Sequence, residues 1–317
     1  ARYMSRIKGC FERLRSEGRR ALIPFVTAGD PDPAITVPMM HRLVEAGADI
    51  IELGVPFSDP MADGPVIQRA AERALAKGTS LHDVLAMVRR FRETDNETPV
   101  VLMGYLNPVE VMGYAAFASE AASAGVDGAL IVDLPPEEGN EMHDALVANN
   151  LDPIFLIAPT STGERITRIC NASSGYVYYV SLKGITGAGH LDLDSVESKL
   201  FEIRAHTDLP VGVGFGIKDA ETASRMGKIA DAVIVGSAIV SRIEEHAAQP
   251  DAAIESVADF VAELRQGLDA ALEPGLLHHA LGLSLVRSRK TDEALGALAR
   301  AAALEPGSGP IRRPSRR

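Results

Sequence analysis

The sequence predicts an α/β fold, a (β/α)8 barrel followed by a short α-helical C-terminal extension. Eight short apolar runs recur between Ala21 and Ser237, rich in Val, Ile, Leu and Phe and without polar alternation. Such runs are typical of parallel strands that are covered on both faces. Each gap between them is long enough for a crossover helix, and eight such units favour a closed TIM barrel over an open doubly wound sheet.

The expected strands occupy residues 21–28, 49–55, 100–105, 128–133, 153–158, 176–181, 210–216 and 232–237. An amphipathic helix is expected before the first strand, because apolar residues recur there at helical spacing. Its apolar side carries Ile7, Cys10, Phe11 and Leu14. A further helix is expected to begin after Ser80, which can form a capping box with Asp83.

The composition excludes several classes of protein. A formal net charge of -11 argues against a general nucleic-acid-binding surface. No stretch of about 18 consecutive apolar residues predicts a membrane span, and the N-terminal segment lacks the apolar core of a secretion signal. We therefore expect a cytoplasmic protein. Its two cysteines, Cys10 and Cys170, lie far apart in expected helices and should be reduced and packed. No histidine or cysteine spacing is typical of a metal site, so none is expected.

Two carboxylates lie close together in the sequence at the end of the second expected strand. Glu52 ends the strand, and Asp63 follows in a tight Asp-Gly-Pro turn. In a barrel, a carboxylate at the carboxyl end of a strand has the position of a catalytic group. Two such groups can move protons in opposite directions if their environments separate their pKa values. Alternatively, Glu52 forms a strand-end salt bridge and Asp63 caps the helix that begins near Pro65.

Glycines at the ends of the last two strands predict a phosphate site. Gly214 and Gly216 end one strand, and Gly236 and Ser237 lead from the other into a helical pattern. Exposed N–H groups and a helix N-terminus bind an anion without Lys or Arg, and this is the usual phosphate position of the barrel. The alternative is that these glycines serve only tight turns and close packing.

The segment from Lys183 to His190 contains three glycines and is a candidate lid over the carboxyl ends of the strands. An ordinary surface loop is the alternative. Lys183 could form a Schiff base, but no feature of the sequence indicates that its amine is desolvated.

Five segments together resemble the tryptophan synthase alpha subunit family. They are PFVTAGDP at residues 24–31, ELGVPFSDPMADGP at 52–65, GITGAG at 184–189, GFGI at 214–217 and VGSAIV at 235–240. The resemblance covers about residues 4–267, and the segment 52–65 is highly specific. It implies a lyase that cleaves indole-3-glycerol phosphate to indole and glyceraldehyde 3-phosphate and has no cofactor of its own. It also implies an α2β2 complex in which indole passes to a beta subunit that holds pyridoxal phosphate.

The resemblance assigns roles residue by residue. Glu52 matches the acid and base that protonates indole C3 and takes the glycerol hydroxyl proton, and Asp63 matches the carboxylate near the indole nitrogen. Thr186 matches the lid residue that orients Asp63. The phosphate-binding backbone corresponds to Gly187, Gly216, Gly236 and Ser237. The substrate pocket corresponds to Tyr178 and Phe215, and the loop that signals to the beta subunit contains Asp59 and Pro60. Phe25, Leu102 and Leu130 are at strand positions that could form the apolar walls of an indole pocket.

The C-terminal part departs from this family. We expect the barrel to span residues 1–267, a helical hairpin to span 268–306 and a disordered basic tail to span 307–317. The hairpin resembles a single tetratricopeptide repeat in the spacing of Leu281, Gly282, Leu285, Ala294, Leu298, Ala301 and Pro306. One repeat cannot bury its own apolar face, so it must dock on the barrel, pair with another chain or stay partly unfolded. A loose hairpin without function is the alternative.

Two other functions are compatible with the residues. The barrel could be a non-catalytic scaffold that recruits a partner through the C-terminal extension. It could also be a different phosphate-binding barrel, such as an isomerase or indole-glycerol phosphate synthase. That second possibility requires a cationic acid near the strand ends, for which Lys183 is the only obvious candidate.

Overall fold

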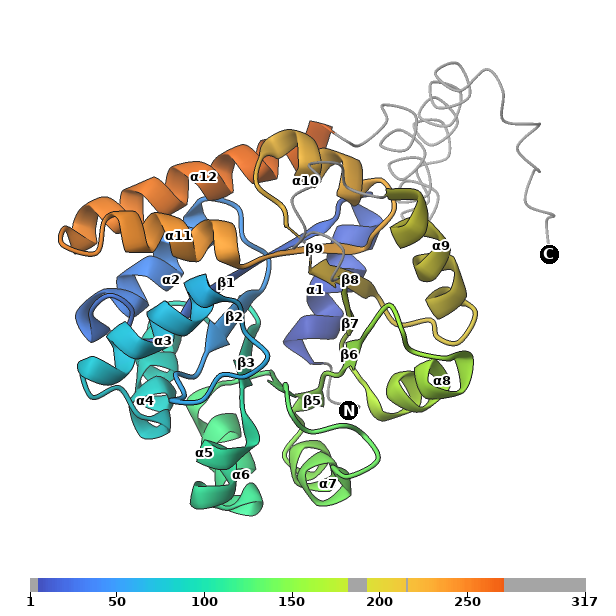
Figure 1. Ribbon diagram of the computed structural model, residues 1–317, viewed down its shortest axis with the longest axis horizontal. Coiled ribbons are helices and arrows are strands. Elements are labelled where there is room, and N and C mark those ends of the chain that lie inside the picture. The colour runs from blue at the N-terminus through green and yellow to red at the C-terminus, as the bar shows by residue number, and fades with distance from the viewer. Residues whose placement is uncertain (1–4, 182–192, 215, 271–317) are drawn as a thin grey trace, which may run out of the picture.

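The computed structural model describes residues 5–181, 193–214 and 216–270, and it confirms the α/β barrel (Figure 1). Its strands are β1 Ala21–Thr27, β2 Ile51–Gly54, β3 Val100–Gly104, β4 Gly128–Ile131, β5 Asp152–Pro153, β6 Leu156–Ile157, β7 Val177–Val180, β8 Val211–Gly214 and β9 Ala232–Val235. Its helices up to β5 are α1 Arg6–Ser16, the 3-10 helix η1 Pro33–Ile35, α2 Thr36–Glu45, α3 Pro65–Ala76, α4 Leu81–Arg92, α5 Leu106–Met112, α6 Tyr114–Ala124 and α7 Asn140–Ala148. Those after β6 are α8 Gly163–Ala172, α9 Leu193–Arg204, α10 Ala220–Gly227, α11 Ser237–Glu245 and α12 Pro250–Ala270.

All strands belong to one parallel sheet with the order β5-β4-β3-β2-β1-β9-β8-β7-β6. The two ends of this order, β5 and β6, are consecutive pieces of the fifth expected strand. The Ile154 N–H donates to the Ala129 carbonyl of β4 at 3.0 Å, and the Phe155 carbonyl accepts from the Tyr178 N–H of β7 at 3.2 Å. The sheet therefore closes on itself through residues 152–157. Each of the eight expected strands is present, and the fifth is divided in two.

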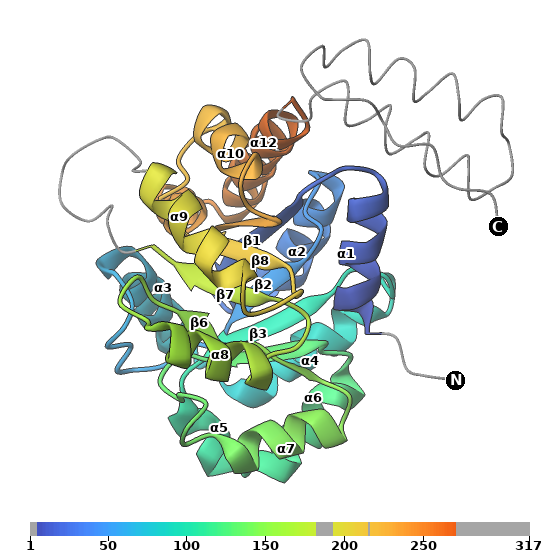
Figure 2. The ribbon, with the colours of Figure 1, turned by 90° about the vertical axis from the view of Figure 1, so that its right-hand side faces the viewer.

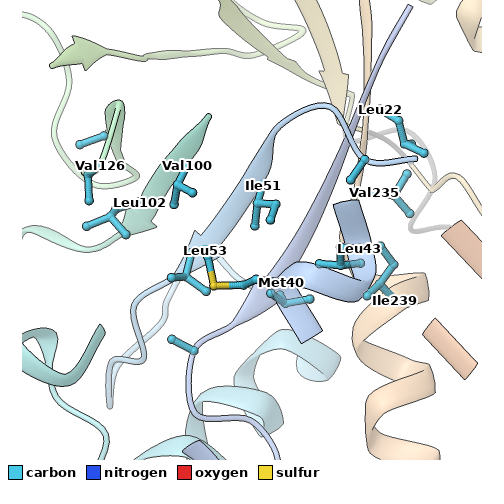
Figure 3. Close-up of a cluster of buried hydrophobic side chains, with 14 of the residues drawn as sticks. Leu22, Met40, Leu43, Ile51, Leu53, Val100, Leu102, Val126, Val235 and Ile239 are labelled. Atoms are coloured by element: carbon cyan, nitrogen blue, oxygen red, sulfur yellow. The ribbon is translucent and has the colours of Figure 1, made fainter. Parts of the chain in front are cut away.

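The core has two layers, one on each side of the sheet. Between the strands and the surrounding helices lies the larger layer, part of which is drawn in Figure 3. It includes Leu22, Met40, Leu43, Ile51, Leu53, Val100, Leu102, Val235 and Ile239. The smaller layer fills the barrel interior, and α1 contributes to it from one end (Figure 2). The expected amphipathic helix is confirmed as α1, whose buried side carries Ile7, Cys10, Phe11 and Leu14.

Other local expectations are also confirmed. Ser80 and Asp83 form the capping box of α4. Cys10 and Cys170 are free and buried. None of the helices within the described residues is long and apolar enough to cross a membrane. Residues 268–270 of the expected extension are instead the end of α12, and the rest of the extension and the basic tail lie outside the described residues.

Aspartates join neighbouring strands at their amino ends. Asp127, just before β4, accepts from the Val100 N–H of β3 at 2.8 Å, from Arg92 of α4 at 2.8 Å and from Arg6 of α1 at 2.9 Å. Two further aspartates each accept hydrogen bonds from a strand N–H and from an arginine. They are Asp49, before β2, and Asp231, before β9. These side chains hold the start of one strand to the start of the next.

Replacing Asp127 by Ala should lower the free energy of unfolding by about 3 kcal/mol, because Arg92 and the Val100 N–H would lose a buried acceptor. Urea unfolding followed by circular dichroism measures the change. The control is Glu164→Ala, which removes a pair with Arg168 in which both side chains are more than half exposed. It should cost less than about 1 kcal/mol. Equal losses in the two variants would contradict the structural role of Asp127.

Candidate active site

Glu52 points into the interior of the barrel. Its neighbours on β2, Ile51 and Leu53, pack outward against the helices, while Ile50 belongs to the interior layer. Because side chains alternate along a strand, the carboxylate of Glu52 is directed inward. The residue is 0% exposed. Among the described residues, no Lys or Arg pairs with it.

The environment of Glu52 leaves it poised between its two protonation states. The Tyr176 hydroxyl donates to Glu52 Oε1 at 2.7 Å, and Oε2 is buried without a hydrogen-bond partner in the described part of the chain. Burial raises the pKa of Glu52 to about 7, and the hydrogen bond from Tyr176 offsets part of that rise. At neutral pH the group can therefore both give and take a proton.

Gly214 of β8 makes room for Tyr178, because a Cβ at this position would overlap the Tyr178 ring. The pKa of Tyr178 is raised well above its ordinary value by burial and, further, by the charges of Glu52 and Asp63. Tyr178, expected in the substrate pocket, thus lies in the interior within the field of both carboxylates.

Asp63 is held by an aromatic residue that the sequence did not single out. The Tyr105 hydroxyl donates to Asp63 Oδ2 at 3.1 Å and accepts from the Ala62 N–H at 3.0 Å. Burial raises the pKa of Asp63, and the hydrogen bond from Tyr105 opposes that rise. The alternative in which Asp63 caps α3 is wrong, because Gly64 is the N-cap and receives no side-chain hydrogen bond. Tyr105 directly follows β3. This position at a strand end is the feature by which the sequence could have identified it as a site residue.

A cavity with mostly apolar walls opens beside Asp63 at the carboxyl ends of β1, β2 and β3. Its walls include Phe25, Ile67, Met103 and Tyr105, and the Phe57 ring stacks on Tyr105 with centroids 5.4 Å apart. Glu52 lies below this cavity and is not part of its wall. The apolar walls and the Asp63 acceptor match a flat ring with an N–H, but the cavity volume of about 20 Å³ holds only a water-sized group, so its walls must separate to admit a ring.

One expected wall residue faces the other way. Leu102 packs in the layer between strands and helices, where Figure 3 shows it beside Val100 and Val126. Alternation along β3 gives the inward position to Met103 instead. Leu130 faces the interior layer, as expected, but below the cavity.

The N-terminus of α11 is the candidate anion site. Gly236 is its N-cap, and no side chain caps the helix. The first N–H groups of a helix have no acceptor within it, so those of Ser237 and Ala238 are available to a ligand. A Cβ on Gly236 would lie 3.9 Å from the Phe25 side chain, which joins this site to the cavity, and Gly216 has open space around it.

The remaining expected residues divide into two groups. Asp59 and Pro60 lie on the loop between the carboxylates, beside Met61, which is 83% exposed. The Asp63 N–H donates to the Pro60 carbonyl at 3.0 Å, so this loop and Asp63 are directly connected. Lys183, Thr186, Gly187 and Phe215 lie outside the described residues. Within the described ranges, His, Cys, Asp and Glu form no group of three that could hold a metal ion.

Comparison with known proteins gives one consistent family. The family pattern described as "Tryptophan synthase alpha chain" matches residues 11–269. The tryptophan synthase alpha chain of Thioalkalivibrio sulfidiphilus is 65% identical over 266 residues, which are 84% of this chain and 100% of that protein. The alpha chain of Alkalilimnicola ehrlichii is 60% identical over 270 residues, 85% of this chain and 98% of that one.

Solved structures agree with the sequence comparison. Tryptophan synthase subunit alpha from Legionella pneumophila superposes with a TM-score of 0.80 at 46% identity, over 84% of this chain and 100% of that chain. A chain of tryptophan synthase from M. tuberculosis, in an aminoacrylate-bound form, superposes with a TM-score of 0.75 at 37% identity, over 84% of this chain and 100% of that one.

Replacing Tyr176 by Phe should raise the pKa of Glu52 above about 7, because the lost hydroxyl stabilises the charged carboxylate. NMR titration of 13C-labelled glutamate side chains measures this pKa, and the spectrum of Glu52→Gln identifies the signal. Tyr179→Phe is the control, since Tyr179 lies on β7, which directly follows Tyr176, but packs in the outer layer. An unchanged titration in Tyr176→Phe would show that the hydrogen bond does not set the pKa.

Proposed function

This chain belongs to the tryptophan synthase alpha chain family, and we propose on that premise that Glu52 and Asp63 carry its reaction. The reaction is the cleavage of indole-3-glycerol phosphate to indole and glyceraldehyde 3-phosphate, a carbon–carbon lyase step of tryptophan biosynthesis. Glu52 is the observation that carries the assignment. It is fully buried, has one carboxylate oxygen without a hydrogen-bond partner among the described residues and has a pKa of about 7.

The chemistry requires an acid, a base and an anion. Indole C3 must become tetrahedral before its bond to the glycerol chain can break, so Glu52 in its protonated form gives a proton to C3. The ring then carries positive charge near its nitrogen, which the carboxylate of Asp63 stabilises. As the carbon–carbon bond breaks, the neighbouring hydroxyl loses its proton to the carboxylate of Glu52 and becomes the aldehyde. The proton count returns to its starting value, and no cofactor is required.

The two ends of the substrate have separate sites in this proposal. The indole ring occupies the cavity between Phe25 and Tyr105, and the phosphate binds at Gly216, Gly236 and Ser237. Tyr178 lies near both carboxylates. Thr186, Gly187 and Phe215 complete the lid, the phosphate site and the pocket on the strength of the family resemblance alone.

No specific observation favours an isomerase or indole-glycerol phosphate synthase, because no Lys or Arg lines the cavity within the described ranges.

As a tryptophan synthase alpha chain, this protein has a beta chain as its partner, and we propose an α2β2 complex in the cytoplasm. The loop with Asp59, Pro60 and the exposed Met61 is suited to touch the beta chain. A contact there would reach Asp63 through the hydrogen bond from its N–H to Pro60. Pyridoxal phosphate belongs to the partner alone.

We propose that residues 1–267 are a self-sufficient barrel and that 268–306 form a separate helical hairpin like one tetratricopeptide repeat, before a basic tail at 307–317. The family pattern ends at residue 269, and 84% of the chain aligns with the Thioalkalivibrio relative over that protein's whole length. The extension is therefore additional to the lyase. Its use as the recruiting arm of a scaffold has no observation in its favour.

Glu52→Gln should lower the rate of indole formation by about 1,000-fold or more, since general acid and base catalysis are both lost. Asp63→Asn should lower it by about 100-fold through weaker stabilisation of the ring charge. Indole release from indole-3-glycerol phosphate, with and without a beta chain, measures both rates. Near-normal turnover in Glu52→Gln with an unchanged circular dichroism spectrum would refute the assignment.

Removing residues 271–317 should leave the rate of indole formation within about twofold of that of the full chain, because α12 ends at Ala270 and the site lies before it. The same assay measures this, and thermal unfolding of the two chains serves as the control for stability. A loss of activity beyond tenfold in a folded truncated chain would indicate that the extension takes part in the reaction.

A further inference from the structure

A network of charged side chains joins the helices α3 and α11 beside the candidate site. Arg73 of α3 forms two parallel hydrogen bonds to Asp30, which follows β1, at 2.6 and 3.0 Å. Its third contact is to Glu244 of α11, at 2.9 Å. Arg69, one turn earlier on α3, binds Glu244 through both carboxylate oxygens at 2.6 and 2.8 Å.

The network is suited to hold geometry rather than to add stability. The Asp30 side chain is 0% exposed and that of Arg73 is 23% exposed, so the pair has lost much of its hydration. Pairs of this kind contribute little net stability, because desolvation offsets their attraction. The planar fork of Arg, bound at two points, does fix the relative position of the groups that it joins. Hydrogen bonds from Arg69 hold the pKa of Glu244 at about 2, so Glu244 is charged throughout the neutral range.

An apolar contact beneath the network packs the same two helices together. Ala70 of α3 and Val240 of α11 form one buried cluster with Phe25 of β1. Phe25 also lies in the cavity wall and close to Gly236. The apolar contact therefore lies between the charged network and the candidate site.

Each of the two helices begins at one end of the proposed substrate site. Asp63 is two positions before Pro65, where α3 begins, and α11 begins at Ser237. At about 1.5 Å per residue, Arg69 and Arg73 lie about 6 and 12 Å along α3, and Glu244 lies about 10 Å along α11. A rigid link between these points sets the distance from Asp63 to the anion site.

We infer that Arg73 and Glu244 are positioning residues for the lyase reaction. They hold the start of α3, which follows Asp63, at a fixed distance from the phosphate-binding end of α11, so that a substrate anchored by its phosphate presents its ring nitrogen to Asp63. Neither residue touches the substrate. This inference depends on the proposed function, because it assumes that phosphate and ring bind at these two ends.

Glu244→Gln and Arg73→Lys test this inference in the full chain. Both should lower kcat for indole formation by about 10-fold, since small displacements of a catalytic group reduce the rate strongly. Lys keeps the charge but cannot form two parallel hydrogen bonds to Asp30. The constant for competitive inhibition by inorganic phosphate, which occupies the anion site alone, should change by less than about twofold.

The chain offers a matched control at another helix pair. Arg42 of α2 binds Glu255 of α12 through two hydrogen bonds of 3.0 and 2.7 Å, away from the candidate site. Glu255→Gln and Arg42→Lys change a pair of the same geometry and should leave kcat unchanged. Circular dichroism establishes the folded fraction, by which each rate is divided.

Two results would overturn the inference. A kcat equal to that of the wild type in folded Glu244→Gln and Arg73→Lys would show that the network affects stability only. If inhibition by phosphate weakened in proportion to the loss of kcat, the network would shape the anion site itself and not the distance between that site and Asp63. Absence of indole formation by the unmodified chain would contradict the proposed function itself, so the two failures are distinguishable.

Discussion

The burial of the Glu52 carboxylate inside a closed barrel is the constraint on which the rest of the site depends. A carboxylate open to water has a pKa near 4.5, whereas here burial brings it to about 7. The sheet keeps water out because it closes through residues 152–157, and α1 fills one end. Between pH 4.5 and 7 the folded chain holds a proton that the unfolded chain releases, so the contribution of Glu52 to stability falls as the pH rises through this window. Burial of the Glu52 carboxylate is thus the cause both of its pKa near neutrality and of its cost to stability.

The second carboxylate has a different support, which suits a different role. Asp63 is on a loop, and its position depends on Tyr105 and on the loop that contains Pro60. Glu52 has a rigid strand beneath it, while Asp63 can respond to whatever touches the exposed loop. The anion site uses the N-terminus of α11 and needs no cationic side chain, so a positive charge does not disturb the pKa values of the two carboxylates. The three parts thus remain electrostatically separate although one substrate joins them.

Much of the barrel could be predicted from the sequence, because uninterrupted apolar runs mark parallel strands and glycines mark the turns after them. Glu52 stood out as a carboxylate in an apolar strand, and the family resemblance supplied a reaction, but the expectation that it ends the strand was wrong, because it is the second residue of β2. The hydrogen bond from Tyr176 to Glu52 could not be predicted from the sequence, because it joins residues 124 positions apart. Leu102 was assigned to the wrong face because a strand that is apolar throughout carries no alternation to indicate which side chains point inward. The pairing of Asp63 with Tyr105 likewise exists only once two loops meet in space.

Closure of the sheet also has a consequence for how the chain folds during synthesis. β1 pairs with β9, and Asp49 beside the first strands pairs with Arg265 of the last described helix, 216 positions later. Neither contact can form until the C-terminal part of the barrel has left the ribosome. Until then, β1 keeps one edge unpaired. The first strands form at most a partial sheet, whose contacts are mostly between neighbours in sequence. The water-free interior that raises the pKa of Glu52 forms only when the sheet closes. Glu52 therefore reaches its raised pKa only in the closed barrel.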